Sequence, residues 1–179
     1  FHEFWTSDNT DPVARVRMQW ACSHFFPASV MAAHVTRWGQ RPIEFACAVA
    51  LSGRFGFDID LEGLSEDEDG ICRRSVALAR RTSAVVQQGD IEHIISPVEG
   101  ADHSRAAVAY HSQRGARSVL FAYQLEGSTT PGPRIRLDAI DESRSYELTS
   151  TDLTTDQPLS VFGAAGAELA AEGLQWPLD

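Results

Sequence analysis

The fold is decided by the stretch FWTSDNTDP, residues 4–12, together with the apolar run that follows it. The extended opening of this stretch is typical of a strand, and Asp11-Pro12 supplies a helix N-cap followed by a first-turn proline. The next apolar run, SVMAAHVT (residues 29–36), is short and bounded by polar residues, as expected of a buried parallel strand. Strand, helix and strand form a βαβ repeat, which predicts a parallel sheet.

The rest of the first half adds two more elements. Apolar residues alternate over 55–61, which predicts a strand, whereas the alternation with alanines over 45–51 leaves helix and strand both open. Ser65 and Glu68 have the spacing of a capping box and predict a helix that ends at Gly89.

Short β-like runs separated by turn residues follow Gly89. They cover residues 91–95, 106–111, 118–125, 134–137 and 146–149. We therefore predict two domains, residues 1–88 and residues 89–179, with an antiparallel meander or sandwich in the second.

Composition narrows the classes of function. Fifteen basic and twenty-five acidic residues give a formal net charge of −10, which disfavours nucleic acid and anionic membrane surfaces as partners. Three cysteines at wide spacing indicate neither a disulfide framework nor a zinc site. We expect a cytoplasmic protein. The chain opens on Phe1 rather than Met and reaches a catalytic-looking loop within eight residues, so we interpret it as a fragment and leave secretion open.

That loop, residues 6–10, follows the first predicted strand and carries carboxylate, amide and hydroxyl groups. Parallel β/α barrels place their catalytic residues at the carboxyl ends of strands. Asp11 is explained as the helix cap. Asp8 is either a turn former or a catalytic carboxylate, and spacing alone leaves both open.

Five pieces of the chain, in order, resemble the α-galactosidases of glycoside hydrolase family 36, the melibiases. The loop WTSDNTD resembles the acid/base segment W-x-S-D-N-T-D of that family, and SVMAAHVT resembles its M-G-A-H-V-[ST] strand. The remaining pieces are RPIEFACAVALSGRFGFDIDLEGLSEDE, QQGDIEHIISPVEG and GLQWPL. Together they span nearly the whole chain.

The resemblance implies the C-terminal strands and helices of a TIM (β/α)8 barrel, followed by an antiparallel β-sandwich domain. It implies a retaining α-galactosidase that releases terminal α-linked galactose from oligosaccharides such as melibiose and raffinose, without metal or cofactor. Asp8 takes the role of general acid/base, and the nucleophile lies upstream of Phe1. The 179 residues alone are therefore expected to be inactive. Trp5, Asn9, His34 and Trp38 are the candidate substrate-binding residues.

Several alternatives stay open. The loop over residues 36–42 is shorter than in many relatives, Ala46 replaces a common arginine, and Glu92-His93 replaces Tyr-Arg. The second domain has the character of a carbohydrate-binding or packing module. An α-N-acetylgalactosaminidase and a galactosyl-transferring enzyme similar to raffinose synthase also fit the resemblance, and so does a homo-oligomer.

Residues 58–69 resemble the calcium-binding loop of an EF-hand, with oxygen ligands at positions one, three and five and Gly63 at position six. Position twelve is Asp69 rather than a bidentate glutamate, and no helical pattern precedes Asp58. We predict that calcium produces no saturable heat in titration calorimetry. Micromolar binding that is lost in Asp58→Ala would contradict this.

Overall fold

The computed structural model describes residues 2–36, 38–100, 102–127, 132–155 and 157–176. The chain divides into two compact units. The first contains Phe1–Gln88 and Thr151–Pro158, and the second contains Gly89–Ser150 and Leu159–Asp179. The first unit thus takes residues from both sides of the predicted boundary at Gly89, and the domain division remains a prediction.

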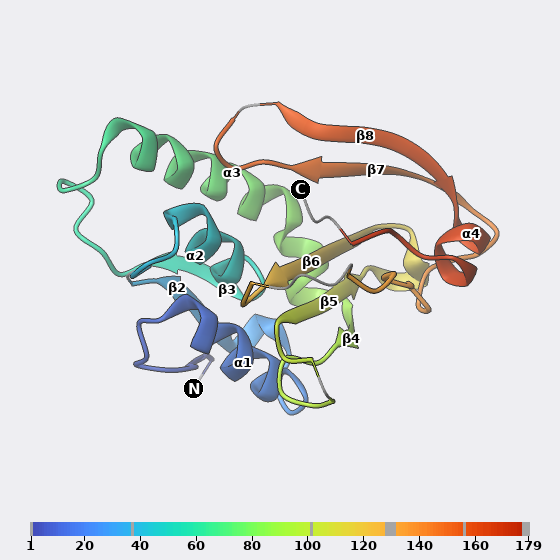
Figure 1. Cartoon of the computed structure of the whole chain (residues 1–179), viewed down its shortest axis with the longest axis horizontal. Coiled ribbons are helices and arrows are strands. Elements are labelled where there is room, and N and C mark those ends of the chain that lie inside the picture. The colour runs from blue at the N-terminus through green and yellow to red at the C-terminus, as the bar shows by residue number, and fades with distance from the viewer. Residues whose placement is uncertain (1, 37, 101, 128–131, 156, 177–179) are drawn as a thin grey trace. The chain divides into compact units, whose positions relative to one another are not determined.

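The first unit is built on a three-stranded parallel sheet in the order β1, β2, β3 (Figure 1). Its strands are β1 (Phe4–Trp5), β2 (Met31–Val35) and β3 (Arg54–Phe57). Trp5 pairs with Ala32, and Ala33 pairs with Phe55. The parallel pairing predicted from the βαβ repeat is confirmed.

Three helices join and cover these strands: α1 (Pro12–Ser23), α2 (Ile43–Ala50) and α3 (Glu66–Gln88). The carboxylate of Asp11 accepts hydrogen bonds from the first turn of α1. At the start of α3, the Glu68 carboxylate accepts from the backbone N–H of Ser65 at 2.9 Å, and the Ser65 hydroxyl accepts from the N–H of Glu68. Both predicted caps are therefore confirmed.

Helix α2 decides the alternative that the sequence left open. Its buried residues recur at helical rather than alternating spacing, and they are Ile43, Ala46, Cys47, Val49 and Ala50. This face packs on β2, and α2 also contacts α1 and α3. Because the alternating alanines are compatible with both a strand and a helix, the sequence pattern did not decide between them. Only a helix places these five buried residues on one face.

The strand predicted over 55–61 is too long. It ends at Phe57, because the Asp60 carboxylate accepts a hydrogen bond from the N–H of Glu62 and begins a turn. Leu61 is exposed, so the alternation continues past the residues that the sheet buries. Strand β3, not a helix, precedes the segment that resembles an EF-hand.

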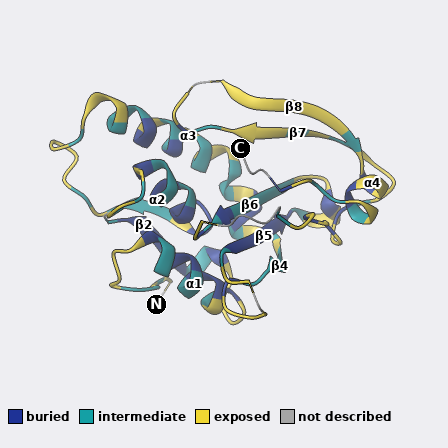
Figure 2. Ribbon diagram, viewed as in Figure 1, coloured by how far each residue is buried: buried dark blue, intermediate teal, exposed yellow. Residues whose placement is uncertain are grey.

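The second unit contains an antiparallel sheet in the order β4, β5, β6. Its strands are β4 (Asp90–Ile95), β5 (Arg105–His111) and β6 (Ser118–Gln124). A short 3-10 turn at Gln113–Gly115 connects β5 to β6, which pair in antiparallel orientation. The central strand β5 is buried along its whole length (Figure 2).

A second sheet pairs β7 (Ser145–Thr151) with β8 (Pro158–Ala165), and α4 (Gly166–Ala171) follows. Neither β8 nor α4 was predicted, because β8 is exposed along most of its length and shows no alternation. The strand predicted over 134–137 is absent: Ile135 forms only an isolated bridge with Leu174.

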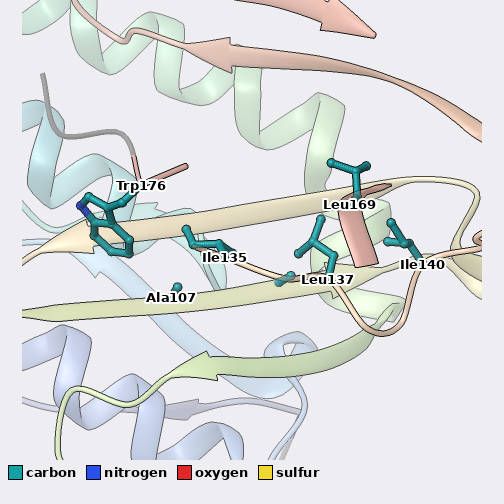
Figure 3. Close-up of a cluster of buried hydrophobic side chains, with 7 residues drawn as sticks. Ala107, Ile135, Leu137, Ile140, Leu169 and Trp176 are labelled. Carbon is teal, nitrogen blue, oxygen red and sulfur yellow. The ribbon is translucent and has the colours of Figure 1, made fainter. Parts of the chain in front are cut away.

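Residues from that bridged segment nevertheless form the core of the second unit (Figure 3). Ile135 and Leu137 pack with small residues of β5 and with the side chains of Leu169 and Trp176. The alanines of β5, Ala107 among them, leave room for this segment to approach the sheet closely. None of the helices in the described part of the chain is long and apolar enough to cross a membrane.

Leu153, in the later stretch of the first unit, is bonded to helix α3. The guanidinium Nε of Arg74 donates a hydrogen bond to the carbonyl of Leu153 at 2.6 Å. The cysteines form no disulfide, and burial raises the pKa of the Cys47 thiol to about 12. A thiol with this pKa is a packing group rather than a nucleophile at neutral pH.

Gly53 precedes β3 where the chain passes close to β2. A Cβ atom there would lie 2.8 Å from the Cβ of Ala33 and 3.0 Å from the carbonyl oxygen of Met31. We predict that Gly53→Ala lowers stability by about 1–3 kcal/mol, because the strand itself would have to move. The control is Gly63→Ala, whose nearest atom would lie 3.7 Å away. Equal melting temperatures for the two variants would contradict the prediction.

Candidate active site

The candidate site lies at the carboxyl ends of the strands of the parallel sheet. The loop over residues 6–11 leaves the carboxyl end of β1, His34 lies near the carboxyl end of β2, and Asp58 directly follows β3. The backbone N–H of Asp58 donates to the carbonyl of Val35 at 2.8 Å, which continues the pairing past the strands. Parallel sheets bind ligands at this edge.

Most polar side chains of the loop form hydrogen bonds that hold the conformation of the loop. Thr6 donates its hydroxyl to a carbonyl of β2 at 3.0 Å. The N–H of Asn9 donates to the hydroxyl of Ser7 at 2.9 Å, and the N–H of Asp11 donates to the Asn9 side-chain oxygen at 2.8 Å. Asp8 differs: its side chain is exposed, and no hydrogen bond or ion pair with another described residue engages it. It is the carboxylate of the loop that is available for chemistry.

The loop is tied to the sheet by Arg15, a residue of α1. Its Nε donates to the carbonyl of Asn9 at 2.7 Å, and its Nη2 donates to the carbonyl of Ser7 at 2.8 Å. Nη1 donates to the carbonyl of His34, and Nη2 lies 2.9 Å from the His34 ring atom Nε2. One guanidinium thus joins the loop to β2. Only 3% of Arg15 is exposed, so these bonds are sheltered from water.

The charges at this edge act on one another. Burial lowers the pKa of the Arg15 guanidinium, while the carboxylates of Asp58 and Asp8 oppose the shift. Arginine keeps its charge even so. Burial first, and then the charge of Arg15, lower the pKa of His34, against the opposing effects of Asp58, Asp8 and the Ala32 backbone. Since arginine can only donate, Nε2 of His34 accepts, and the proton of the neutral ring sits on Nδ1.

The structure brings four of the five predicted site residues together. Asp8 and Asn9 lie in the loop, and the half-exposed ring of Trp5 stands over the ring of His34, with centroids 3.5 Å apart. The fifth, Trp38, is partly buried, and its carbonyl accepts a hydrogen bond from the N–H of Arg41. Among the described residues, no hydrogen bond or ring contact joins it to the other four. Their roles in substrate binding stay predictions.

Arg15 and Asp58 were missed by the sequence reasoning. Asp58 was considered only as a calcium ligand. Arg15 lies four residues after the helix cap, on the face of α1 that also buries Val16 and Gln19. A charged residue on the buried face of a helix is the signal that could have identified it.

Outside this loop, the described residues offer no metal cluster and one polar hollow. No group of three or more histidine, cysteine or acidic side chains in the described ranges is placed to hold a metal ion. A hollow of about 470 Å³ lies in the second unit, beside β4, and its polar lining includes Glu92, His93, Arg134 and Arg136. Glu92 is engaged there, because it accepts from the N–H of Asp138 and binds His111.

Known proteins resemble the chain over its whole length. The family model described as Melibiase matches residues 1–89. The chain is 30% identical to α-galactosidase AgaA of Geobacillus stearothermophilus, over 97% of this chain and 23% of AgaA. It is 31% identical to α-galactosidase C of Emericella nidulans, over all of this chain and 23% of that protein.

Solved structures agree with these matches. The structure of the family 36 α-galactosidase AgaB from Geobacillus stearothermophilus superposes on 99% of this chain with a TM-score of 0.84 and 29% identity, and the match covers 24% of AgaB. Variants of AgaA have been solved with raffinose and with stachyose.

These relatives are glycoside hydrolases. The chain belongs to the melibiase family, the α-galactosidases of glycoside hydrolase family 36. It spans about a quarter of the length of the relatives that it matches.

The lowered pKa of His34 predicts how stability depends on pH. Below about pH 6.5, His34 in the unfolded chain takes up a proton, whereas His34 in the folded chain stays neutral until the pH reaches its lowered pKa. The free energy of unfolding therefore decreases as the pH falls from about 6.5 through the lowered pKa. Nitrogen NMR of the full-length protein should find a neutral ring with the proton on Nδ1 at pH 6.5. His34→Gln should weaken the acid loss of stability. A charged His34 at that pH would contradict the assignment.

Proposed function

We propose that the full-length protein containing these residues is a retaining α-galactosidase, with Asp8 as its general acid/base. Retaining glycosidases use two carboxyl groups, one as nucleophile and one as acid/base. The observation that carries the proposal is an exposed and unengaged carboxylate, Asp8, at the carboxyl end of a parallel strand in a chain of the melibiase family. The nucleophile would come from residues outside these 179.

The described strands support a barrel as the setting. We propose that β1, β2 and β3 are the last strands of a parallel β/α barrel, that α3 closes it, and that the antiparallel sheets form a β-sandwich domain. Each strand of the first unit is followed by a helix, as a barrel requires. A three-stranded parallel sheet has two unpaired edges, and further strands of a barrel would cover them.

The environment of Asp8 suits a group that both gives and takes a proton. In the first step it would protonate the departing glycosidic oxygen, and in the second it would deprotonate the incoming water. A carboxylate locked in a hydrogen bond would have to break it in each step. Asp8 has no such bond within the described residues, whereas the Asp11 carboxylate is occupied by two N–H groups of α1.

The proposed substrates are oligosaccharides that end in α-linked galactose. The AgaA variants solved with raffinose and stachyose support this class. The half-exposed ring of Trp5, stacked on His34 beside the loop, offers an apolar surface of the kind on which sugar rings stack.

A general acid matters most when the leaving group is poor, because a good leaving group departs without a proton. We predict that Asp8→Ala slows cleavage of melibiose by a factor on the order of 10² to 10⁴. The first step on an activated aryl α-galactoside should be slowed much less, so the glycosyl-enzyme should accumulate. Azide should restore turnover and yield the α-galactosyl azide with retained configuration, as product analysis by NMR would detect.

Asp11→Ala is the matched control, three residues away in the same loop. Loss of a helix cap costs ~1 kcal/mol of stability and should not depend on the leaving group. Equal slowing of both substrates by Asp8→Ala, with no azide product, would exclude Asp8 as the acid/base. The same rescue in Asp11→Ala would move the role to Asp11.

A further inference from the structure

The main chain on each side of Asp8 is held by one buried side chain. Arg15 donates hydrogen bonds to the carbonyl of Ser7 at 2.8 Å and to the carbonyl of Asn9 at 2.7 Å, and these residues come immediately before and after Asp8. We propose that Arg15 is a positioning residue for the acid/base: it fixes the backbone around Asp8 so that the free carboxyl stays in reach of the glycosidic oxygen. This inference rests on the proposed function.

The chemistry of arginine fits this task. Its planar guanidinium presents five N–H donors in a fixed fork, so two carbonyls bound to it are also fixed relative to each other. A lysine ammonium is a compact charge without that geometry. Because both bonds are made to backbone carbonyls, the Asp8 side chain between them stays unengaged and able to exchange protons.

Arg15 is itself held by strand β2 of the sheet. Arg15 also donates to the carbonyl of His34, and its Nη2 contacts Nε2 of the same residue at 2.9 Å. The lowered pKa keeps the His34 ring neutral and able to accept this bond, because a protonated ring would present a second donor to the guanidinium. The carbonyls on both sides of Asp8 are thereby connected to β2 through one buried guanidinium.

Position decides the rate of proton transfer. A displacement of about 1 Å in an active site can cost roughly 10²-fold in rate. Other bonds of the loop do not replace Arg15: Thr6 binds β2 before Ser7, and Asp11 caps α1 after Asn9. Without Arg15, the loop would keep the bonds of Thr6 and Asp11 and those between its own residues, but the carbonyls of Ser7 and Asn9 would lose their connection to β2.

The test compares Arg15→Met and Arg15→Lys in the full-length enzyme. The amount of active enzyme is measured from the first-turnover burst of an activated aryl α-galactoside, so that loss of folded protein does not enter the rates. We expect Arg15→Met to lower kcat/KM for melibiose by roughly 10- to 100-fold and the first step on the aryl substrate by about threefold or less. Arg15→Lys should lie between Arg15→Met and the unaltered enzyme.

A double mutant separates positioning from general damage. In the Asp8→Asn variant there is no general acid for Arg15 to position. Adding Arg15→Met to that variant should therefore leave the ratio of the rates on the aryl substrate and on melibiose unchanged. The control for removal of a buried arginine is Arg105→Met in the second unit, where Arg105 is 2% exposed and binds Asp102 at 2.8 Å. It should lower the melting temperature without changing the ratio of the two substrates.

Equal losses on both substrates in Arg15→Met would overturn the inference and leave Arg15 a structural residue. If Arg15→Met yields no folded enzyme, Arg15→Lys carries the same comparison, and an unchanged substrate ratio there also overturns it. The proposed function fails separately: in that case Asp8→Asn itself shows no dependence on the leaving group, or the unaltered enzyme cleaves no α-galactoside.

Discussion

The buried guanidinium of Arg15 is the constraint on which the candidate site depends. It binds two carbonyls of the loop after β1 and two atoms of His34 in β2, so it bonds the loop to the sheet. Burying such a group is unfavourable unless its donors are satisfied. The loop carbonyls and β2 satisfy it, and in return the loop cannot move without exposing a buried charge.

The same constraint explains why the loop can carry a reactive side chain. Polar groups of an exposed loop usually compete for one another, and here Ser7, Asn9 and Asp11 are used in bonds that shape it. Arg15 then fixes the backbone from beneath. Asp8 is left with an exposed carboxylate that no hydrogen bond or ion pair within the described residues engages, so the carboxylate can exchange protons without breaking one.

Much of the fold of the first unit could be predicted from the sequence, because its signals are local. The Asp11 cap, the Ser65 capping box and the apolar run of β2 are decided within a few residues, and each formed as expected. Prediction failed where burial is decided by distant partners. The segment around Ile135 alternates between buried and exposed residues as a strand does, yet it forms only an isolated bridge to Leu174. Strand β8 pairs with β7 while staying exposed, so in neither segment do burial and strand pairing go together.

The sequence by itself determined the family, the parallel pairing of the first unit and the loop that holds Asp8, because these depend on motifs and on caps read along the chain. Only the tertiary structure decided that Arg15 and His34 belong to the same site. They lie nineteen residues apart on different elements and meet only when α1 packs beside β2. The place of Arg15 on the buried face of α1 could indicate burial, but only the tertiary structure shows which carbonyls the guanidinium reaches.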